Sequence, residues 1–216
     1  MKKYPSIKFM NQITRGEGIP DGDEWYVFDK IDGSNIRAEW SKKKGFYKFG
    51  RRHALLDSSN PVLQESPDIL KNGMDAKLSA EFKKRGYQRV LCFFEFAGDK
   101  SFSGSHAAEP HRLTLIDIDV YRVGLLSPKD FVALVTAADL TEGTDYATVL
   151  YSGKVTQQII DDVMNSNLPG MTFEGAVFKI QDRKHNRRVF KVKTSLWLDK
   201  LRDHCGDDEG LFKRLM

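Results

Sequence analysis

Two carboxylates interrupt apolar stretches of this sequence. Glu95 stands within residues 90–98, and Glu174 stands within residues 173–180. Burying an ionised carboxylate costs free energy unless a cation or several hydrogen-bond donors meet it. A glutamate near the end of a buried strand can also simply reach solvent, which is the alternative for Glu95. Otherwise the two acids indicate a site that holds cations or a ligand.

A pair of lysines near the end of the chain predicts a contact with phosphate. Lys191 and Lys193 alternate with Phe190 and Val192 in a strand-like segment. Because side chains alternate between the faces of a strand, both lysines are expected on one face. Two neighbouring cations repel each other unless an anion lies between them, and phosphate is the natural candidate.

A further lysine, Lys30, follows an apolar, strand-like run that begins at Trp25. A second alternating run begins near Ile36, and residues 32–34 have the Asp-Gly-Ser composition of a tight turn. We therefore expect a hairpin with Lys30 at its mouth. A solvated lysine on a surface hairpin is the plainer interpretation of the same pattern.

Four short motifs together resemble those of the covalent nucleotidyltransferases, the superfamily of polynucleotide ligases and messenger-RNA capping enzymes. They are a Lys-x-Asp-Gly motif at residues 30–33, a strand motif at 94–98, a Glu-Gly-x-Val motif at 174–177 and a Lys-x-Lys motif at 191–193. The extension of the first motif to Asn35 is most similar to RNA ligases of the nick-sealing type. The motifs stand in the family's order and span most of the chain.

The resemblance implies an ATP-dependent RNA ligase that joins 3′-hydroxyl and 5′-phosphate ends. Lys30 would attack the α-phosphorus of ATP to give a lysyl-adenylate, and burial and nearby positive charges would favour its neutral form. Lys191 and Lys193 would stabilise charge on the α-phosphate, and Glu174 would support a Mg²⁺ or Mn²⁺ ion. The implied nucleotide site comprises Asp29, Asp32, Gly33, Asn35, Arg51, Glu95, Ile116, Glu174, Lys191 and Lys193.

Individual roles follow from the same resemblance. Glu95 would contact the ribose, and Asn35 would position the donor phosphate. An arginine would engage the nucleotide phosphates, and the motif offset favours Arg51 over Arg52. Ile116 stands where the family commonly has an aromatic residue that packs on the purine, so this chain departs from the pattern there.

The elements between the motifs predict one α+β domain over residues 1–216, an ATP-grasp-like nucleotidyltransferase domain of twisted, mainly antiparallel sheets with flanking helices. The strand at residues 113–121 should alternate, with Leu115, Asp117 and Asp119 on one face. Helices are expected at 60–86, from Ser127, and at 156–165, and a short strand at 146–151. A closing helix from Ser195 would end the domain, with no oligonucleotide-binding barrel after it.

Composition indicates what kind of protein this is and where it is expected to be found. A content of 40% hydrophobic residues is typical of a globular protein. A net charge of +4 is compatible with phosphate binding. Neither a membrane-spanning run nor the apolar core of a signal peptide is apparent, so we expect a cytoplasmic protein. Two cysteines make no disulfide framework, and His106 and His111 lack further ligands at metal-binding spacing.

Nucleic acid and ATP are the expected partners, and a separate substrate-binding protein is a further possibility. Basic segments at Lys42–Lys44 and Arg183–Arg188 are candidates for contact with RNA. A DNA ligase or a GTP-using capping enzyme is the alternative among enzymes. A non-catalytic nucleic-acid-binding protein is a third interpretation, but it leaves Glu95 and Glu174 unexplained.

Overall fold

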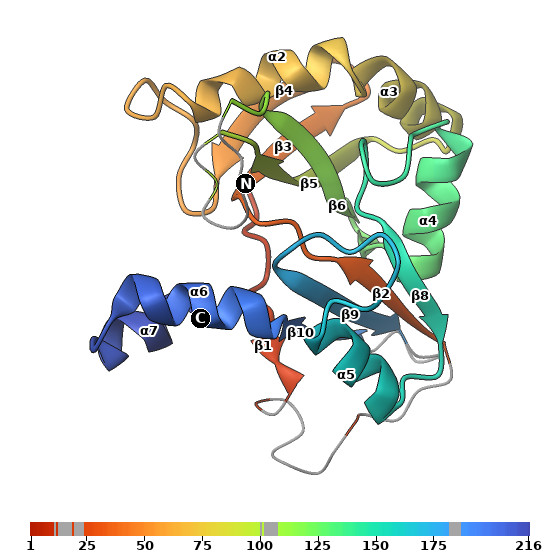
Figure 1. Ribbon diagram of the computed structural model, residues 1–216. Helices are drawn as coiled ribbons and strands as arrows, with labels where there is room; N and C mark the ends of the chain where they lie inside the picture. Colours follow the sequence, from red (N-terminus) through yellow and green to blue (C-terminus); the bar gives the residue numbers. More distant parts are fainter. Residues whose placement is uncertain (11, 13–18, 20–23, 100, 102–107, 182–186) are drawn as a thin grey trace. The chain divides into compact units, whose positions relative to one another are not determined.

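The computed structural model describes residues 1–10, 12, 19, 24–99, 101, 108–181 and 187–216 (Figure 1). These residues form two compact units. Unit 1 takes its described residues from Met1–Ser6, Gly33–Ser101 and His106–Ala147, and unit 2 takes its own from Ile7–Asp32 and Thr148–Met216. His106 and residues 183–186 of the predicted basic segment lie outside the described part of the chain.

Unit 1 is built on a five-stranded antiparallel sheet with the order β4-β3-β5-β6-β7. The strands are β3 Ser34–Ser41, β4 Gly45–Arg51, β5 Arg89–Ala97, β6 Arg112–Val120 and β7 Gly124–Leu125. The helices are η1 Leu63–Glu65, α2 Ser66–Asn72, α3 Asp75–Lys84 and α4 Pro128–Ala137. Ser127 caps α4 as predicted, because its side chain accepts a hydrogen bond from the Asp130 amide.

One face of the unit 1 sheet is apolar and packs against α3. Trp40 is fully buried, its ring lies 5.2 Å from that of Phe82, and its indole Nε1 donates to Ser79 Oγ at 2.9 Å. Ile36 and Ala38 share this face by strand alternation and are also fully buried. The opposite face carries the alternate residues of β3, among them Asn35 and Glu39.

Unit 2 contains a second five-stranded sheet, with the order β1-β10-β9-β2-β8. Its pairs are antiparallel except for the parallel pair of β1 and β10. The strands are β1 Lys8–Phe9, β2 Trp25–Asp29, β8 Val149–Gly153, β9 Gly175–Gln181 and β10 Arg187–Lys193. The helices are α5 Gln157–Met164, α6 Ser195–Cys205 and α7 Glu209–Leu215.

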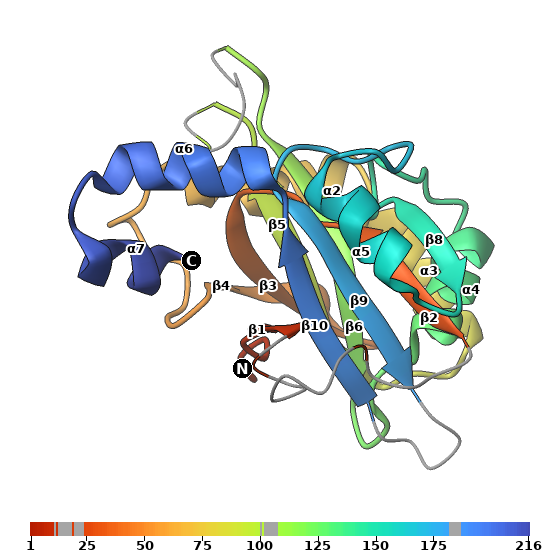
Figure 2. The same cartoon turned by 60° about the horizontal axis from the view of Figure 1, so that its bottom comes forward.

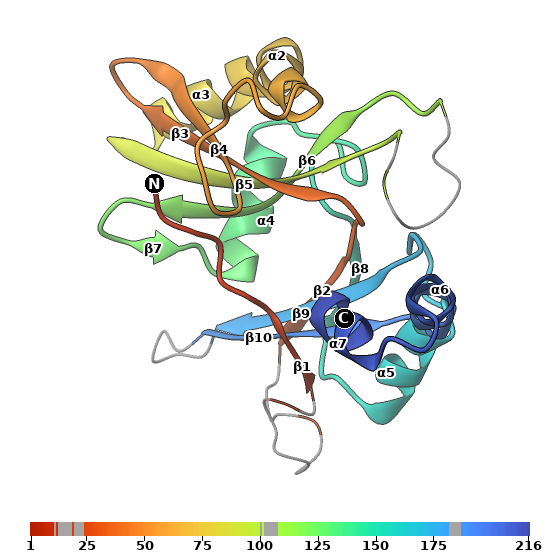
Figure 3. The ribbon, with the colours of Figure 1, turned by 90° about the vertical axis from the view of Figure 1, so that its left-hand side faces the viewer.

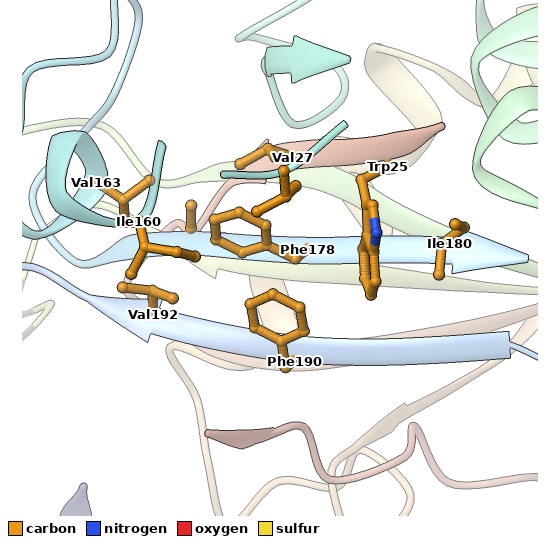
Figure 4. Close-up of a cluster of buried hydrophobic side chains, with 10 residues drawn as sticks. Trp25, Val27, Ile160, Val163, Phe178, Ile180, Phe190 and Val192 are labelled. Atoms are coloured by element: carbon orange, nitrogen blue, oxygen red, sulfur yellow. The ribbon is translucent and has the colours of Figure 1, made fainter. Parts of the chain in front are cut away.

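The core of unit 2 lies between this sheet and α5 (Figure 4). Phe178 and Phe190 stack with ring centroids 4.5 Å apart, and Trp25 meets Phe190 edge-on at 5.2 Å. Ile160 and Val163 of α5 complete the cluster. Because β9 and β10 turn these side chains toward α5, the alternate residues, including Lys191 and Lys193, lie on the other face.

The predicted hairpin around Lys30 is wrong. β2 pairs with β8 and β9, whereas β3 pairs with β4 and β5, so residues 30–33 connect two different sheets. Gly33 is needed at this connection for close approach: a Cβ there would lie 2.3 Å from the Phe96 carbonyl oxygen. The sequence pattern identified both strands but not their partners.

Three further expectations need correction. The helical stretch at 60–86 is divided into η1, α2 and α3, and the strand expected at 146–151 forms as β8, Val149–Gly153. The predicted alternation in β6 is broken by a bulge, since Phe93 pairs with Asp117 but Phe94 pairs with Leu115. Leu115 and Asp117 therefore lie on opposite faces.

The antiparallel sheets with flanking helices confirm the predicted α+β fold class. The closing helix is also present and extends to Cys205. No helix among the described residues is both long enough and apolar enough to span a membrane.

Candidate active site

Three charged side chains meet at one edge of the unit 2 sheet, beside the ends of β2 and β10 and the beginning of β9. Lys30 directly follows β2, Glu174 directly precedes β9, and Lys193 is the last residue of β10. Lys30 Nζ donates to Glu174 Oε2 at 2.7 Å, and Lys193 Nζ donates to Glu174 Oε1. The backbone supports this arrangement, because the Lys30 amide donates to the Gly175 carbonyl at 2.9 Å.

Gly175 permits the approach of β9 to β10 at this point. Its φ is 141°, and a Cβ on it would lie 2.1 Å from the Val192 carbonyl oxygen. Only glycine fits both the conformation and the space. The glycine of the Glu-Gly-x-Val motif therefore brings Glu174 beside Lys193, whose register partner is Gly175 itself.

Two ammonium groups contact the same carboxylate in this cluster. One carboxylate, Glu174, holds two ammonium groups, and Glu174 and Lys193 are 4% and 5% exposed. Burial lowers the pKa of Lys193 to about 8; Glu174 opposes this shift, while the positive charges of Lys30 and Lys191 add to it. A phosphate bound beside Lys193 would stabilise the charged form of this lysine.

The Lys193 ammonium also rests against Trp197, with Nζ 3.3 Å from the ring centroid. Trp197 lies in the first turn of α6, which follows directly from β10 (Figure 2). Thr194 caps this helix: its Oγ1 accepts from the Trp197 amide at 3.1 Å and donates to the Phe173 carbonyl at 2.7 Å. The cap ties the start of α6 to the segment that carries Glu174.

Lys191 shares a strand face with Lys193 but has different contacts. Its Nζ donates to the Met216 carbonyl at 2.7 Å and lies 4.3 Å from the centroid of the Phe9 ring. The structure thus divides the predicted lysine pair: Lys193 contacts the carboxylate, whereas Lys191 contacts Met216, directly after α7, and Phe9 of β1.

Asp29 is buried at the end of β2 and holds the loop before Glu174. Its Oδ1 accepts from the Thr172 amide and its Oδ2 from the Thr172 hydroxyl, both at 2.9 Å. This contact gives Asp29 a structural role beside the cluster. Asp32, the last residue of unit 2 before unit 1 begins, is half-buried.

A second group of predicted site residues lies in unit 1. Asn35 and Glu95 are register partners in β3 and β5, so their side chains share a face of the sheet. Asn35 Nδ2 donates to the Phe94 carbonyl at 3.2 Å, while its Oδ1 is buried without a hydrogen-bond partner among the described atoms. A buried acceptor without a donor is costly, which indicates a place for a donor from a ligand or water.

Ile116 and Arg51 occupy other positions in the same sheet. Ile116 is the extra residue of the β6 bulge and is half-buried. Arg51 pairs with Ile36, which lies on the face opposite to Asn35. The register therefore does not group Arg51 with Asn35 and Glu95.

Sequence reasoning missed the partners of two buried acids in β6. Tyr4 donates its hydroxyl to Asp117 at 3.0 Å and packs its ring 4.8 Å from that of Phe93, while Lys2 pairs with Asp119. The alternation of acids with apolar residues indicated that partners were needed, but not that the first residues of the chain supply them.

Arg37 was missed as well. It is 3% exposed, and its guanidinium donates to the backbone carbonyls of Met1, Lys2, Arg51 and Ala54. Arg37 thereby fixes residues 1–2 on the unit 1 sheet. An arginine between the buried residues Ile36 and Ala38 was the signal that could have identified it.

Glu174 offers a divalent cation a single carboxylate, and within the described ranges no group of three His, Cys, Asp or Glu side chains could hold a metal ion. Mg²⁺ commonly keeps several waters and binds through one or two carboxylates together with substrate phosphates. A lone Glu174 fits that mode and does not fit an all-protein cage. His111 is engaged elsewhere, since its Nδ1 lies 2.8 Å from Glu65 Oε2.

The two mainly antiparallel sheets with flanking helices are those of the nucleotidyltransferase fold found in RNA ligases. A family model described as RNA ligase matches residues 23–193, which is most of the sequence, and the chain belongs to the RNA ligase family. Among curated proteins, no sequence match reaches significance.

Solved structures of an RNA ligase from Naegleria gruberi are similar to this chain. The complex with PPi gives a TM-score of 0.65 at 17% identity, over 94% of this chain and 58% of the other. A lysine-to-alanine mutant with ATP and Mn gives 0.64 at 18%, over 93% and 58%. At this identity the likeness concerns the fold, and the chain spans less than two thirds of the length of these proteins.

Proposed function

We propose that this chain is the adenylyl-transferring part of an ATP-dependent RNA ligase that works through a covalent lysyl-adenylate on Lys30. Membership of the RNA ligase family supports the reaction class. The observation that carries the assignment is the contact of Lys30 and Lys193 with the two oxygens of the buried Glu174. The Naegleria ligase structures with ATP, AMP and PPi support nucleotide binding by this fold.

In the first step Lys30 Nζ attacks the α-phosphorus of ATP. The nitrogen-phosphorus bond forms, the bond to pyrophosphate breaks, and the amine releases its proton to solvent. Only the neutral amine is a nucleophile, so Lys30 must give up its proton before the new bond forms. The neighbouring ammonium groups of Lys30 and Lys193 also suit a site that receives a triphosphate.

The adenylyl group then passes to an RNA 5′-phosphate, and a 3′-hydroxyl displaces AMP to form the phosphodiester. In both transfers Lys193 would hold charge that develops on the α-phosphate. Glu174 would hold a divalent cation through its waters, and the bound ion would neutralise phosphate charge. Glu174 would at the same time keep Lys30 and Lys193 in position.

The covalent step is tested by incubating the protein with α-labelled ATP and magnesium. We expect label on the wild-type protein and on Lys129→Ala, which removes an exposed lysine from α4. Lys30→Ala should carry no label, and a chelator should prevent labelling of the wild type. Unlabelled wild-type protein in the presence of magnesium would exclude the lysyl-adenylate mechanism.

The substrate is tested by sealing nicked duplexes that carry either RNA or DNA on the 3′-hydroxyl side. We expect faster sealing with RNA, and faster labelling with ATP than with GTP. A preference for DNA ends would indicate a DNA ligase, and a preference for GTP would indicate a capping-type enzyme.

A further inference from the structure

Positive and aromatic side chains gather at one end of the unit 1 sheet. The β3–β4 turn, the start of β5 and the β6–β7 turn lie together there, on the left of Figure 3. The backbone joins them, since Lys42 N donates to the Gln88 carbonyl and Tyr121 N donates to the Arg89 carbonyl, both at 3.1 Å. We call this surface the basic end; its residues are Lys42, Lys43, Lys44, Tyr47, Arg89, Tyr121 and Arg122.

The aromatic rings of the basic end are exposed and contact its cations. Tyr121 is 52% exposed, with the guanidinium carbons of Arg89 and Arg122 at 5.0 and 5.3 Å from its ring centroid. Tyr47 is 40% exposed, with Lys44 Nζ at 5.0 Å from its ring. A tyrosine this exposed buries little apolar area and so contributes little to the stability of the fold. Its ring does offer a flat surface on which a base can stack, beside cations that attract phosphate.

One buried carboxylate supports the basic end from below. Glu39 accepts from the Tyr47 hydroxyl at 2.5 Å and from Arg89 Nη2 at 3.0 Å. Burial raises the pKa of Glu39, but these hydrogen bonds more than offset that effect and lower it. The Glu39 carboxylate is therefore charged and orients Tyr47 and Arg89. With its negative charge set against the five cations of the basic end, the net charge of this surface is +4.

The β6–β7 turn presents Arg122 in a conformation that side chains rarely adopt. Its φ is 69°, in the left-handed region, where glycine and asparagine are the usual residues. The neighbouring Val123 is 70% exposed, so packing does not explain the choice of residues in this turn. The turn therefore presents the Arg122 side chain to solvent.

The basic end lies at a defined distance from the candidate site residues of unit 1. Asn35 and Ser41 are six positions apart in β3, and Ser41 pairs with Arg89 as Asn35 pairs with Glu95. At about 3.3 Å per residue, roughly 20 Å separate the two ends of the strand. A polynucleotide held at Asn35 could follow the sheet to the basic end over several nucleotides.

We propose that the basic end binds single-stranded RNA, with its lysines and arginines on the phosphates and Tyr121 stacked on a base. This inference rests on the proposed RNA ligase function, because it assigns the surface that grips the RNA at a distance from the ends being joined. RNA is favoured over an acidic protein because exposed rings alternate with the cations.

The test measures binding of a 5′-phosphorylated single-stranded RNA of about 20 nucleotides, by fluorescence anisotropy over a range of salt concentrations. A triple variant replaces Lys42, Lys43 and Arg122 by Ala. Its control replaces Lys71, Lys83 and Lys129 of α2, α3 and α4, so both proteins lose three exposed positive charges. All six side chains are exposed, and circular dichroism verifies that both variants fold.

We expect the first variant to bind RNA about tenfold more weakly than the control and to lose about two units of salt slope, at ~0.7 per phosphate contact. Tyr121→Ala should weaken binding about fivefold or more, while Tyr121→Phe should bind as wild type. Equal RNA affinity in the two triple variants would overturn the proposal, as would wild-type binding by Tyr121→Ala.

Labelling with ATP separates this proposal from the one on which it rests. Lys30 labelling should be unchanged in the first triple variant, because none of its residues belongs to the candidate active site. Labelled wild-type protein together with equal RNA affinity of the two triple variants would reject the basic end alone. Unlabelled wild-type protein whose RNA binding depends on the basic end would reject the ligase mechanism and retain the RNA-binding surface.

Discussion

The lysine-carboxylate cluster shows why individual charges were easier to predict than their contacts. Glu174 was predicted from the cost of an unneutralised charge in an apolar strand, Lys193 from its place beside Lys191 on one strand face, and Lys30 from its position in the Lys-x-Asp-Gly motif. Their pairing was not predictable, since 144 positions separate Lys30 from Glu174. Both Lys191 and Lys193 were also predicted to contact phosphate, although their contacts in the structure differ.

That difference predicts unequal effects of two alanine substitutions. Lys193→Ala should slow single-turnover labelling of Lys30 by about 100-fold, because it removes the cation nearest to the nucleophile and its carboxylate. Lys191→Ala should slow labelling by about tenfold, since Lys191 lies farther from Glu174 along the strand. Labelling of Lys193→Ala at the wild-type rate would remove Lys193 from the proposed phosphate contact.

The pKa of Lys193 predicts how nucleotide affinity changes with pH. A lysine with a pKa of about 8 is charged at pH 7 and largely neutral at pH 9, so a phosphate loses an attractive partner as pH rises. Affinity for α,β-methylene ATP, which Lys30 cannot cleave, should fall severalfold between pH 7 and 9. Calorimetry measures this change.

Lys193→Ala is the control for the pH experiment. This variant should bind the analogue more weakly at pH 7 and show a smaller decrease toward pH 9. If wild type and Lys193→Ala respond identically to pH, another group is responsible for the dependence.

At the scale of elements, local pattern predicted strands better than sheets. β3 and β10 were expected from alternation, β5 and β9 were expected from nearly continuous apolar runs, and the two sheets belong to the predicted fold class. The hairpin error arose because Asp-Gly-Ser fits a tight turn equally well whether the strands it joins pair with each other or not. The bulge at Ile116 likewise has no signal in the alternation on either side of it.

Close backbone approach at Gly33 predicts a specific cost for a Cβ. Gly33→Ala should lower the free energy of unfolding by at least ~2 kcal/mol, because the new carbon would lie 2.3 Å from the Phe96 carbonyl oxygen and strand β5 would have to move. Chemical denaturation measures the change.

Gly45→Ala is the matched control, since a Cβ at Gly45 meets nothing within 4 Å and only its φ of 66° opposes the substitution. Its cost should be about 1 kcal/mol. Equal destabilisation by the two substitutions would mean that the approach to the Phe96 carbonyl costs no more than a strained turn position, and would reject close packing against β5 as the reason for a glycine at position 33.

At the scale of the whole molecule, the described chain begins in unit 1, passes into unit 2, returns to unit 1 and finishes in unit 2. Unit 2 takes Lys30 from before the unit 1 stretch and Glu174 and Lys193 from after it. Residues 1–6 belong to unit 1, where Arg37 and Asp117 hold them, and Lys8–Phe9 already pair with β10 of unit 2. These associations depend on packing between segments that are distant in the sequence. Sequence periodicity reports only local structure and therefore does not predict them.

The division of the predicted site residues between the units yields a last prediction, on Asn35. Asn35 Oδ1 is a buried acceptor without a donor among the described atoms, and Asn35 belongs to unit 1, whereas the nucleophile belongs to unit 2. Because the resemblance assigns Asn35 to the donor phosphate, Asn35→Ala should leave labelling of Lys30 within about tenfold of wild type. Sealing of RNA that already carries a 5′-adenylate should fall by about 100-fold, as after loss of one positioning hydrogen bond in a transition state. Asn35→Asp loses the amide donor and adds a negative charge where the donor phosphate is expected, so it should seal no faster than Asn35→Ala. If Asn35→Ala slows labelling and sealing to the same degree, Asn35 serves the nucleotide and not the RNA ends.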